Sequence, residues 1–281
     1  EATRTDDPAA AAALLRAAIQ QEPSNPWPRL DLARLMARSG QGAAARQMME
    51  ESVAGRSSPD ALHAAAIFAG EQRRYADAVR LLERLPSGVR GADQNRLLAS
   101  ARAQAEVASA AALPRQQARA RLLAIASRPD PSGEAGPAAV RALNAMGETA
   151  LAQQAARQAA IAARGQSPSV QIAAAGALLE AGLDQEAAIR AQGIDPARLS
   201  AEQRRAATDL QAGLAIRQSD QLNRQGDQAA AFEALAPALR NDPQNPAANL
   251  ALGRLYQGAR ETAQAQRIAE AVLSRNPLNT D

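Results

Sequence analysis

The sequence predicts an all-α fold: a right-handed solenoid, or superhelix, of helix–turn–helix repeats with irregular joints. Three observations favour it. Ala and Leu dominate the apolar content, only 2% of the residues are aromatic, and small apolar residues recur with a period of about 34 residues. Ala and Leu are strong helix formers, whereas strand-favouring residues are scarce. Because Ala adds little to the distance between packed helices, this composition predicts closely packed helix pairs.

The clearest repeat begins at Pro246. Counted from Pro246 as position 1, the pattern residues stand at positions 7, 8, 11, 20, 27 and 32: Leu252, Gly253, Tyr256, Ala265, Val272 and Pro277. This is the pattern of the tetratricopeptide repeat, a pair of helices, A and B, in about 34 residues. Small residues at positions 8 and 20 stand where the two helices cross, and the proline at position 32 ends helix B.

The same register fits five further starting points: Pro26, Pro59, Gly133, Pro168 and Ala212. In four of these repeats position 15, just before helix B, is a glycine: Gly40, Gly147, Gly182 and Gly226. Glycine at this point predicts a left-handed cap at the end of helix A. An isolated segment from Asp7 to Glu22 has the pattern of a helix B whose helix A is missing.

Two steps between repeats depart from the period. The step from Pro59 to Gly133 is 74 residues, which holds one extra repeat, with its helix B aligned on Ala118, Leu122 and Ile125. The step from Pro168 to Ala212 is 44 residues, about 10 too many for one repeat. Within that excess, Ser200 and Gln203 form a capping-box pattern, which predicts a long helix that runs to about Arg224.

These spacings divide the chain into five parts. We expect helix B of a truncated repeat at 1–25, a first repeat group at 26–91, a second group with an irregular entry at 92–191, a hinge and extra helix segment at 192–211, and a C-terminal repeat group at 212–281. Inserted helices weaken the stacking locally, so the joints are expected to let the array bend. No signal peptide stands at Glu1, and both ends fit an array cut from a longer one.

Charge and cysteine content restrict the class of function. The 32 basic and 29 acidic residues leave a formal net charge of +3, which is too small to predict nucleic-acid binding. All the basic residues are arginines. Cysteine is absent, which removes disulfides, cysteine nucleophiles and zinc–thiolate sites. No apolar run approaches the roughly 18 residues that a membrane-spanning helix needs.

No catalytic, cofactor-binding or metal-binding constellation is recognisable in the sequence. His63 is the single histidine, so neither a catalytic triad nor a histidine metal site has a second member. Carboxylate pairs such as Glu50 and Glu51 are adjacent, and neighbouring side chains diverge on a helix. The sequence therefore predicts a protein that is not an enzyme.

The inner groove formed by the A helices is the better candidate site, for contact with a protein or a glucan. Its arginine-rich positions would suit a peptide carboxylate or an acidic partner surface, because guanidinium groups bind carboxylates through two parallel hydrogen bonds. The structural alternative is a solvated helix face. The candidate residues are Trp27, Arg34, Arg38, His63, Glu71, Arg141, Asn144, Asp220, Asn223, Arg224, Arg254 and Gln257.

A sugar-binding track would need a row of aromatic platforms, and the sequence holds few aromatic residues. Tyr75 and Tyr256 occupy packing positions of their repeats. Trp27 is the one candidate for an exposed platform, and packing between repeats is the alternative for it. We therefore expect a scaffold that holds proteins together, rather than a surface that grips a polymer tightly.

Three stretches, 27–40, 250–257 and 271–278, resemble the periplasmic tetratricopeptide repeat region of the outer-membrane protein family that exports bacterial cellulose during its synthesis. The resemblance implies a periplasmic, non-catalytic scaffold without a cofactor. It would link an inner-membrane cellulose synthase to the outer-membrane β-barrel of the full-length protein and help to guide the glucan. Its partners would be other proteins of the cellulose synthesis and export complex, and also the glucan chain.

Two other interpretations remain open at this point. One is a scaffold for a different exopolysaccharide, which the gene neighbourhood would reveal. The other is a cytoplasmic tetratricopeptide adaptor that binds acidic peptides, and a signal peptide upstream of Glu1 would separate it from an exported protein.

Overall fold

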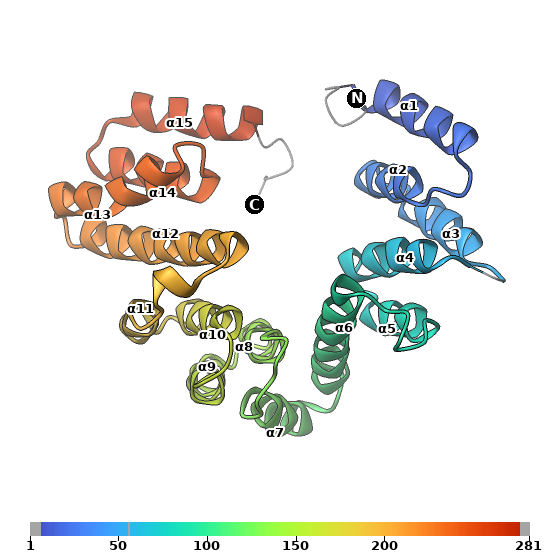
Figure 1. Ribbon diagram of the computed structural model, residues 1–281. Helices are drawn as coiled ribbons and strands as arrows, with labels where there is room; N and C mark the ends of the chain where they lie inside the picture. The colour runs from blue at the N-terminus through green and yellow to red at the C-terminus, as the bar shows by residue number, and fades with distance from the viewer. Residues whose placement is uncertain (1–6, 56, 276–281) are drawn as a thin grey trace. The chain divides into compact units, whose positions relative to one another are not determined.

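The computed structural model describes residues 7–55 and 57–275, and within them it contains fifteen α-helices, one short 3-10 helix and no strand (Figure 1). The predicted all-α solenoid of helical repeats is confirmed. Its right-handed course stays a prediction. The α-helices are α1 (Pro8–Gln21), α2 (Trp27–Arg38), α3 (Gly42–Ser52), α4 (Pro59–Glu71), α5 (Tyr75–Glu83), α6 (Ala92–Ala111), α7 (Arg115–Ala126), α8 (Ala135–Ala145), α9 (Thr149–Ala162), α10 (Pro168–Glu180), α11 (Asp184–Gln192), α12 (Ala201–Arg224), α13 (Gln228–Asn241), α14 (Pro246–Gly258) and α15 (Thr262–Arg275), and the 3-10 helix is η2 (Pro196–Arg198).

The chain forms two compact units. Unit 1 is Glu1–Ala112 and includes α1 to α6, and unit 2 is Leu113–Asp281 and includes α7 to α15. The extra repeat expected between Pro59 and Gly133 therefore contributes α6 to one unit and α7 to the other. The five-part division expected from the spacings stays a prediction.

Unit 1 stacks the helix pairs α2/α3 and α4/α5, and α6 packs on α5. The residues at positions 8 and 20 lie where the sequence pattern puts them. Ala33 and Ala45 in the first pair, and Ala66 and Ala78 in the second, have no solvent-exposed surface. Phe68, Leu82 and Met49 fill the space beside them. Small side chains at the helix crossings and large ones around them therefore form the core of this unit.

Unit 2 repeats this arrangement in the pairs α8/α9, α10/α11, α12/α13 and α14/α15. Ala152, Ala187 and Ala231 hold position 20 of the first three pairs and have no exposed surface. Position 8 of the third pair is Ser219, which is also fully buried, and its hydroxyl has no hydrogen-bond partner among the described residues. A serine is small enough for this helix crossing, although an unpaired buried hydroxyl is unfavourable.

The left-handed caps before helix B are present in every repeat of the register. The four predicted glycines, Gly40, Gly147, Gly182 and Gly226, have φ between 75° and 84°. In the repeats from Pro59 and Pro246 the same position holds an arginine, Arg73 or Arg260, with φ of 57° and 63°. In each case the next residue donates its N–H to a carbonyl five residues earlier, such as Arg74 to Ala69. The turn geometry is thus fixed by the repeat, and two repeats adopt it without glycine.

The predicted capping box opens α12. Ser200 Oγ accepts from the Gln203 N–H at 3.2 Å, and Gln203 Oε1 accepts from the Ser200 N–H at 2.9 Å. The helix ends at Arg224, as expected. The expected B helices are also present: Asp7 caps α1, and Ala118, Leu122 and Ile125 are buried on α7.

Pro277, expected to end the last helix B, lies outside the described residues. Among the helices of the described part, none combines the length and the apolar character needed to cross a bilayer.

Candidate interaction surface on the A helices

The twelve candidate groove residues all lie on A helices, and we call them the A-helix surface. In unit 1, α2 carries Trp27, Arg34 and Arg38, and α4 carries His63 and Glu71. In unit 2, α8 carries Arg141 and Asn144, α12 carries Asp220, Asn223 and Arg224, and α14 carries Arg254 and Gln257. Since the two units are separate bodies, the A-helix surface has one part on each of them.

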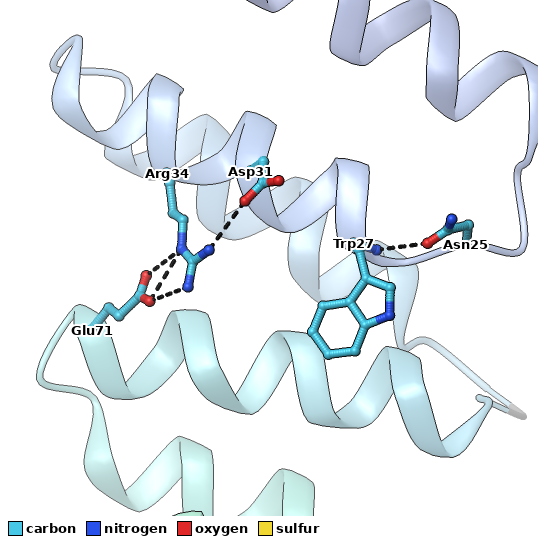
Figure 2. A network of polar contacts seen from close by, with 5 residues as sticks. All are labelled: Asn25, Trp27, Asp31, Arg34 and Glu71. Carbon is cyan, nitrogen blue, oxygen red and sulfur yellow. Dashed lines mark hydrogen bonds and ion pairs between the residues drawn. The ribbon is translucent and has the colours of Figure 1, made fainter. Parts of the chain in front are cut away.

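Arg34 and Glu71 join two successive A helices of unit 1 (Figure 2). The Arg34 Nε donates to both Glu71 oxygens at 3.1 and 3.0 Å, and its Nη2 lies 2.5 Å from Oε1. Arg34 Nη1 donates to Asp31 on the same helix at 3.1 Å. Hydrogen bonding to Glu71 raises the pKa of Arg34. All three guanidinium nitrogens are therefore held by carboxylates of the chain itself.

The same contact recurs in unit 2 between α8 and α10. Arg141 Nη1 donates to the two Glu180 oxygens at 3.2 and 3.4 Å. Asn144, one turn further along α8, donates to the Glu180 carbonyl at 3.2 Å. Arg34 and Arg141 both stand at position 9 of a repeat, and Glu71 and Glu180 both stand at position 13 of the next. We call this contact the 9–13 clamp.

A third pair of A helices, α12 and α14, is joined by a variant of this contact with the charges reversed. Arg254 donates from Nε and Nη2 to the two Asp220 oxygens at 3.0 and 2.8 Å. Asn223 donates to the Arg254 carbonyl at 3.2 Å. A Cβ on Gly258 would lie 2.5 Å from Asn223 Oδ1, so the glycine leaves room for the asparagine.

These contacts change what the arginines of the A-helix surface can offer a partner. Arg34, Arg141 and Arg254 already bind carboxylates within the chain. Among the described residues, Arg38 and Arg224 are exposed and make no ion pair or side-chain hydrogen bond. The two are therefore the arginines of this surface that are open to a carboxylate from another molecule.

Trp27 both packs between repeats and remains partly exposed, the two alternatives that the sequence leaves open for it. Its ring meets the ring of His63 on the next A helix edge to face, with centroids 5.7 Å apart and planes at 82°. The side chain nevertheless stays 41% exposed above α4 (Figure 2). Its backbone N–H donates to Asn25 Oδ1 at 3.1 Å, which fixes the start of α2. Part of the indole thus packs against the next repeat, while the rest faces solvent.

A second group of arginine contacts, between B helices, has no counterpart in the sequence prediction. Glu148 accepts from both Arg115 and Arg119, and these hydrogen bonds, with that from Arg119 the stronger, lower its pKa. Arg157 and Glu186 join α9 and α11 through bonds of 2.9 to 3.2 Å. Each pair spans about one repeat in sequence, and no local pattern identifies it.

The described residues show no cluster of three or more His, Asp and Glu side chains placed to hold a metal ion. His63 has the indole of Trp27 as its neighbour, and no carboxylate bonds to it in the described part of the chain. The arrangement supports binding through charged and aromatic groups on a rigid helical surface.

Comparison with known proteins also indicates a protein built from helical repeats. A family model described as "Tetratricopeptide repeat" matches residues 2–66 and 222–281, at the two ends of the array. The repeated helix pairs and their small-residue crossings define a tetratricopeptide-repeat protein. Within that class, the chain is similar over nearly its whole length to part of several proteins named cellulose synthase operon protein C.

These relatives match almost the entire chain. Cellulose synthase 2 operon protein C of Komagataeibacter xylinus is 36% identical over 99% of this chain. Cellulose synthase operon protein C of Xanthomonas axonopodis pv. citri is 31% identical over 92% of it. The matches cover 22% and 18% of the two relatives, so the chain spans about a fifth of their length.

Solved structures resemble the chain only at the level of the helical repeat. The human IFIT1 dimer with m7Gppp-AAAA has a TM-score of 0.43 at 16% sequence identity, and the match covers 96% of this chain and 58% of that one. A TM-score this low carries no inference about function.

Proposed function

We propose that the chain is a non-catalytic scaffold segment of a cellulose-synthesis and export complex. It holds other proteins of that complex through the A-helix surface. It lies in the periplasm and connects an inner-membrane synthase with an outer-membrane channel in the full-length protein. The observation that carries the proposal is similarity over nearly the whole chain to several proteins named cellulose synthase operon protein C.

The exposed groups of the A-helix surface support a protein partner more than a glucan. Arg38 and Arg224 are exposed and bind no carboxylate in the described part of the chain, and each suits an acidic side chain of a partner. Trp27 is the one residue of this surface that offers an aromatic platform to a sugar ring. Since a glucan track would need a row of such platforms, guidance of the glucan is the lesser part of the role.

The internal contacts of the array support a spanning role. Repeats contact chiefly their neighbours, so a row of them extends as a rod or coil whose length is set by repeat number. The 9–13 clamps fix how one A helix sits on the next. Segment 192–211, which holds η2 and the start of α12, is the proposed point of bending.

The proposal is tested by charge reversal in the full-length protein, expressed from its own locus in a cellulose-producing bacterium. Arg38→Glu combined with Arg224→Glu places repulsive charges on the A-helix surface. We expect co-isolation with the synthase complex and cellulose output to fall several-fold, because each lost charge-assisted bond is worth about 1.5 to 3 kcal/mol.

The matched control is Arg46→Glu combined with Arg240→Glu. Both arginines are exposed on B helices and make no ion pair in the described part of the chain, and Arg240 shares with Arg38 and Arg224 a place in the last turn of a helix. The control is expected to retain co-isolation and output. Equal cellulose output from both double variants, each folded by circular dichroism, would contradict the proposal.

A further inference from the structure

A cavity of about 410 Å³ lies between α9, α10 and α11 of unit 2, apart from the A-helix surface. Ligand-binding cavities fall in this range of volume. Its wall from α10 includes Leu178, which is buried, and its walls from the two B helices include Ala160 and Ile189. We call it the α9–α11 pocket.

The rim of the α9–α11 pocket carries the two most exposed large hydrophobic side chains of the described residues. Ile189 is 70% exposed and Ile161 is 59% exposed, and both line the cavity. A single exposed aliphatic residue is ordinary on a protein surface, whereas exposed aliphatic residues gathered at a cavity mark an interaction site. Packing of the core does not explain either isoleucine, because α9 and α11 bury alanines, Ala159, Ala160 and Ala187, and leave Ile161 and Ile189 exposed.

The same cavity holds two guanidinium groups that lack a carboxylate. Glu186, the one acidic residue in its lining, is bound by Arg157. Arg190 donates to the Ala160 carbonyl near the end of α9, and Arg164 makes no ion pair or side-chain hydrogen bond among the described residues. Burial, followed by the nearby charge of Arg164, lowers the pKa of Arg190. The pocket therefore concentrates positive charge that nothing in the described chain neutralises.

A comparable cavity in unit 1 offers its arginines more acidic partners than the α9–α11 pocket does. That cavity, of about 300 Å³, lies between α3, α4 and α5 and is lined by three arginines. Two of these, Arg74 and Arg80, bind Asp77, and Arg74 also binds Glu50. The third, Arg84, donates to carbonyls at the end of α3. Two of its three arginines are thus paired with carboxylates, and none of the exposed large hydrophobic residues lines it.

We propose that the α9–α11 pocket binds a partner protein segment in which a carboxylate side chain stands next to a large aliphatic or aromatic side chain. The carboxylate pairs with Arg164 and Arg190, and the apolar side chain rests on Ile161 and Ile189. Charge complementarity selects an acidic partner. The lining has no aromatic side chain on which a sugar or base could stack, which argues against a glucan or a nucleic acid as the occupant.

The test is fluorescence anisotropy with the full chain and two labelled peptides. One is a short Gly-Ser peptide with the central sequence Glu-Phe-Glu, and the other has Gln-Phe-Gln in the same background. We expect binding of the acidic peptide and at least roughly tenfold weaker binding of the neutral one, because charge-assisted hydrogen bonds are lost. No binding of the acidic peptide at millimolar concentration, or equal binding of the two peptides, would overturn the proposal.

Two variants locate the binding. Arg164→Gln removes the free guanidinium, and Ile189→Glu removes an exposed apolar group and adds a repelling charge; neither side chain is buried. Each is expected to weaken binding of the acidic peptide about tenfold or more. Arg205→Gln on α12 and Phe232→Glu on α13 are the matched controls at exposed positions outside the pocket. Equal affinity of the pocket variants and their controls would place the binding elsewhere and refute the assignment.

Discussion

Arginine is the residue that joins successive repeats in both units. Arg34 and Arg141 bind a glutamate on the following A helix, and Arg157 binds one on the following B helix. These pairs are partly exposed, so each contributes only about 0 to 1 kcal/mol. Burying one Leu side chain contributes about 1.5 to 3 kcal/mol, so the apolar crossings supply the stability. The ion pairs instead fix the register of one helix on the next.

Glu148 gives a prediction for the pH dependence of stability. Its hydrogen bonds from Arg119 and Arg115 lower its pKa in the folded chain below the ordinary value of 4.5. As pH falls below 4.5, the unfolded chain binds this proton first, so the free energy of unfolding decreases until the folded-state pKa is also passed. We expect Glu148→Gln to be less stable than the parent at pH 7 and to lose less stability on acidification.

Urea unfolding of unit 2, followed by circular dichroism from pH 7 to pH 3, measures this difference. Glu233→Gln is the control, because Glu233 is exposed on α13 and forms no ion pair within the described residues. If the Glu148 variant and the parent lost stability in parallel over this pH range, the two arginines would not be stabilising the carboxylate.

Arg73 gives a second prediction at the residue scale. A left-handed conformation costs a non-glycine residue about 1 to 2 kcal/mol, whereas glycine loses about 0.5 to 1 kcal/mol more chain entropy on folding. Arg73→Gly should therefore stabilise unit 1 by about 0.5 to 1 kcal/mol. Gly40→Ala makes the reverse change at the equivalent position, where the added Cβ would meet nothing within 4 Å. A lower urea midpoint for Arg73→Gly would disprove the strain at this turn.

At the scale of the element, the helix crossings tolerate only small side chains. A Cβ on Gly136 of α8 would lie 2.7 Å from the Ala159 Cβ of α9. Alanine would gain up to about 1 kcal/mol of helix propensity, but overpacking costs about 1 to 3 kcal/mol. The contact with Ala159 is close enough that packing should dominate, so we expect Gly136→Ala to destabilise unit 2.

Gly176 on α10 is the matched control for this substitution. It lies inside a helix of the same unit, and a Cβ there would have no neighbour within 4 Å. Gly176→Ala should therefore stabilise the unit by up to about 1 kcal/mol through helix propensity alone. The two variants are expected to shift the urea midpoint in opposite directions, and a shift in the same direction would show that the α8–α9 crossing is not tight.

A single sequence predicts the local features of the helices better than the contacts between them. The left-handed glycines, the capping box of Ser200 and the buried alanines at positions 8 and 20 depend on local rules, and the sequence predicts all of them. The 9–13 clamp depends on two residues 37 or 39 positions apart, and the sequence does not show which helix faces which. It places Arg34 and Glu71 on the A-helix surface without indicating that they bond to each other. Glu180 stands at the same position 13 of its repeat, but the candidate residues do not include it.

The sequence does not predict the α9–α11 pocket either, for a related reason. The lining comes mainly from three helices, and each contributes only a few residues whose pattern is ordinary alone. Ile189 does offer a signal, because it stands off the buried stripe of its short helix, next to Arg190 and two positions beyond Ala187. Detecting it from sequence would require knowing which face of α11 the neighbouring helices cover.

At the scale of the whole molecule, the proposed bending at segment 192–211 can be measured directly. The chain has no cysteine, so pairs of spin labels can be placed at chosen residues. Labels at Gln154 on α9 and Glu233 on α13 lie on either side of this segment, whereas labels at Gln221 and Glu233 both follow it. We expect the first pair to show the broader distance distribution, since inserted segments weaken repeat stacking. Equally narrow distributions from the two label pairs would show that the chain does not bend at segment 192–211.

The proposed function depends above all on binding of the A-helix surface to another protein of the cellulose apparatus. A photo-crosslinking amino acid in place of Arg38, in the full-length protein within cellulose-producing cells, tests it most directly. Arg46, exposed on the B helix of the same repeat, is the reference position. We expect a crosslink to a protein of the synthase complex from position 38 and none from position 46. Crosslinks from both positions alike, or from neither, would contradict it.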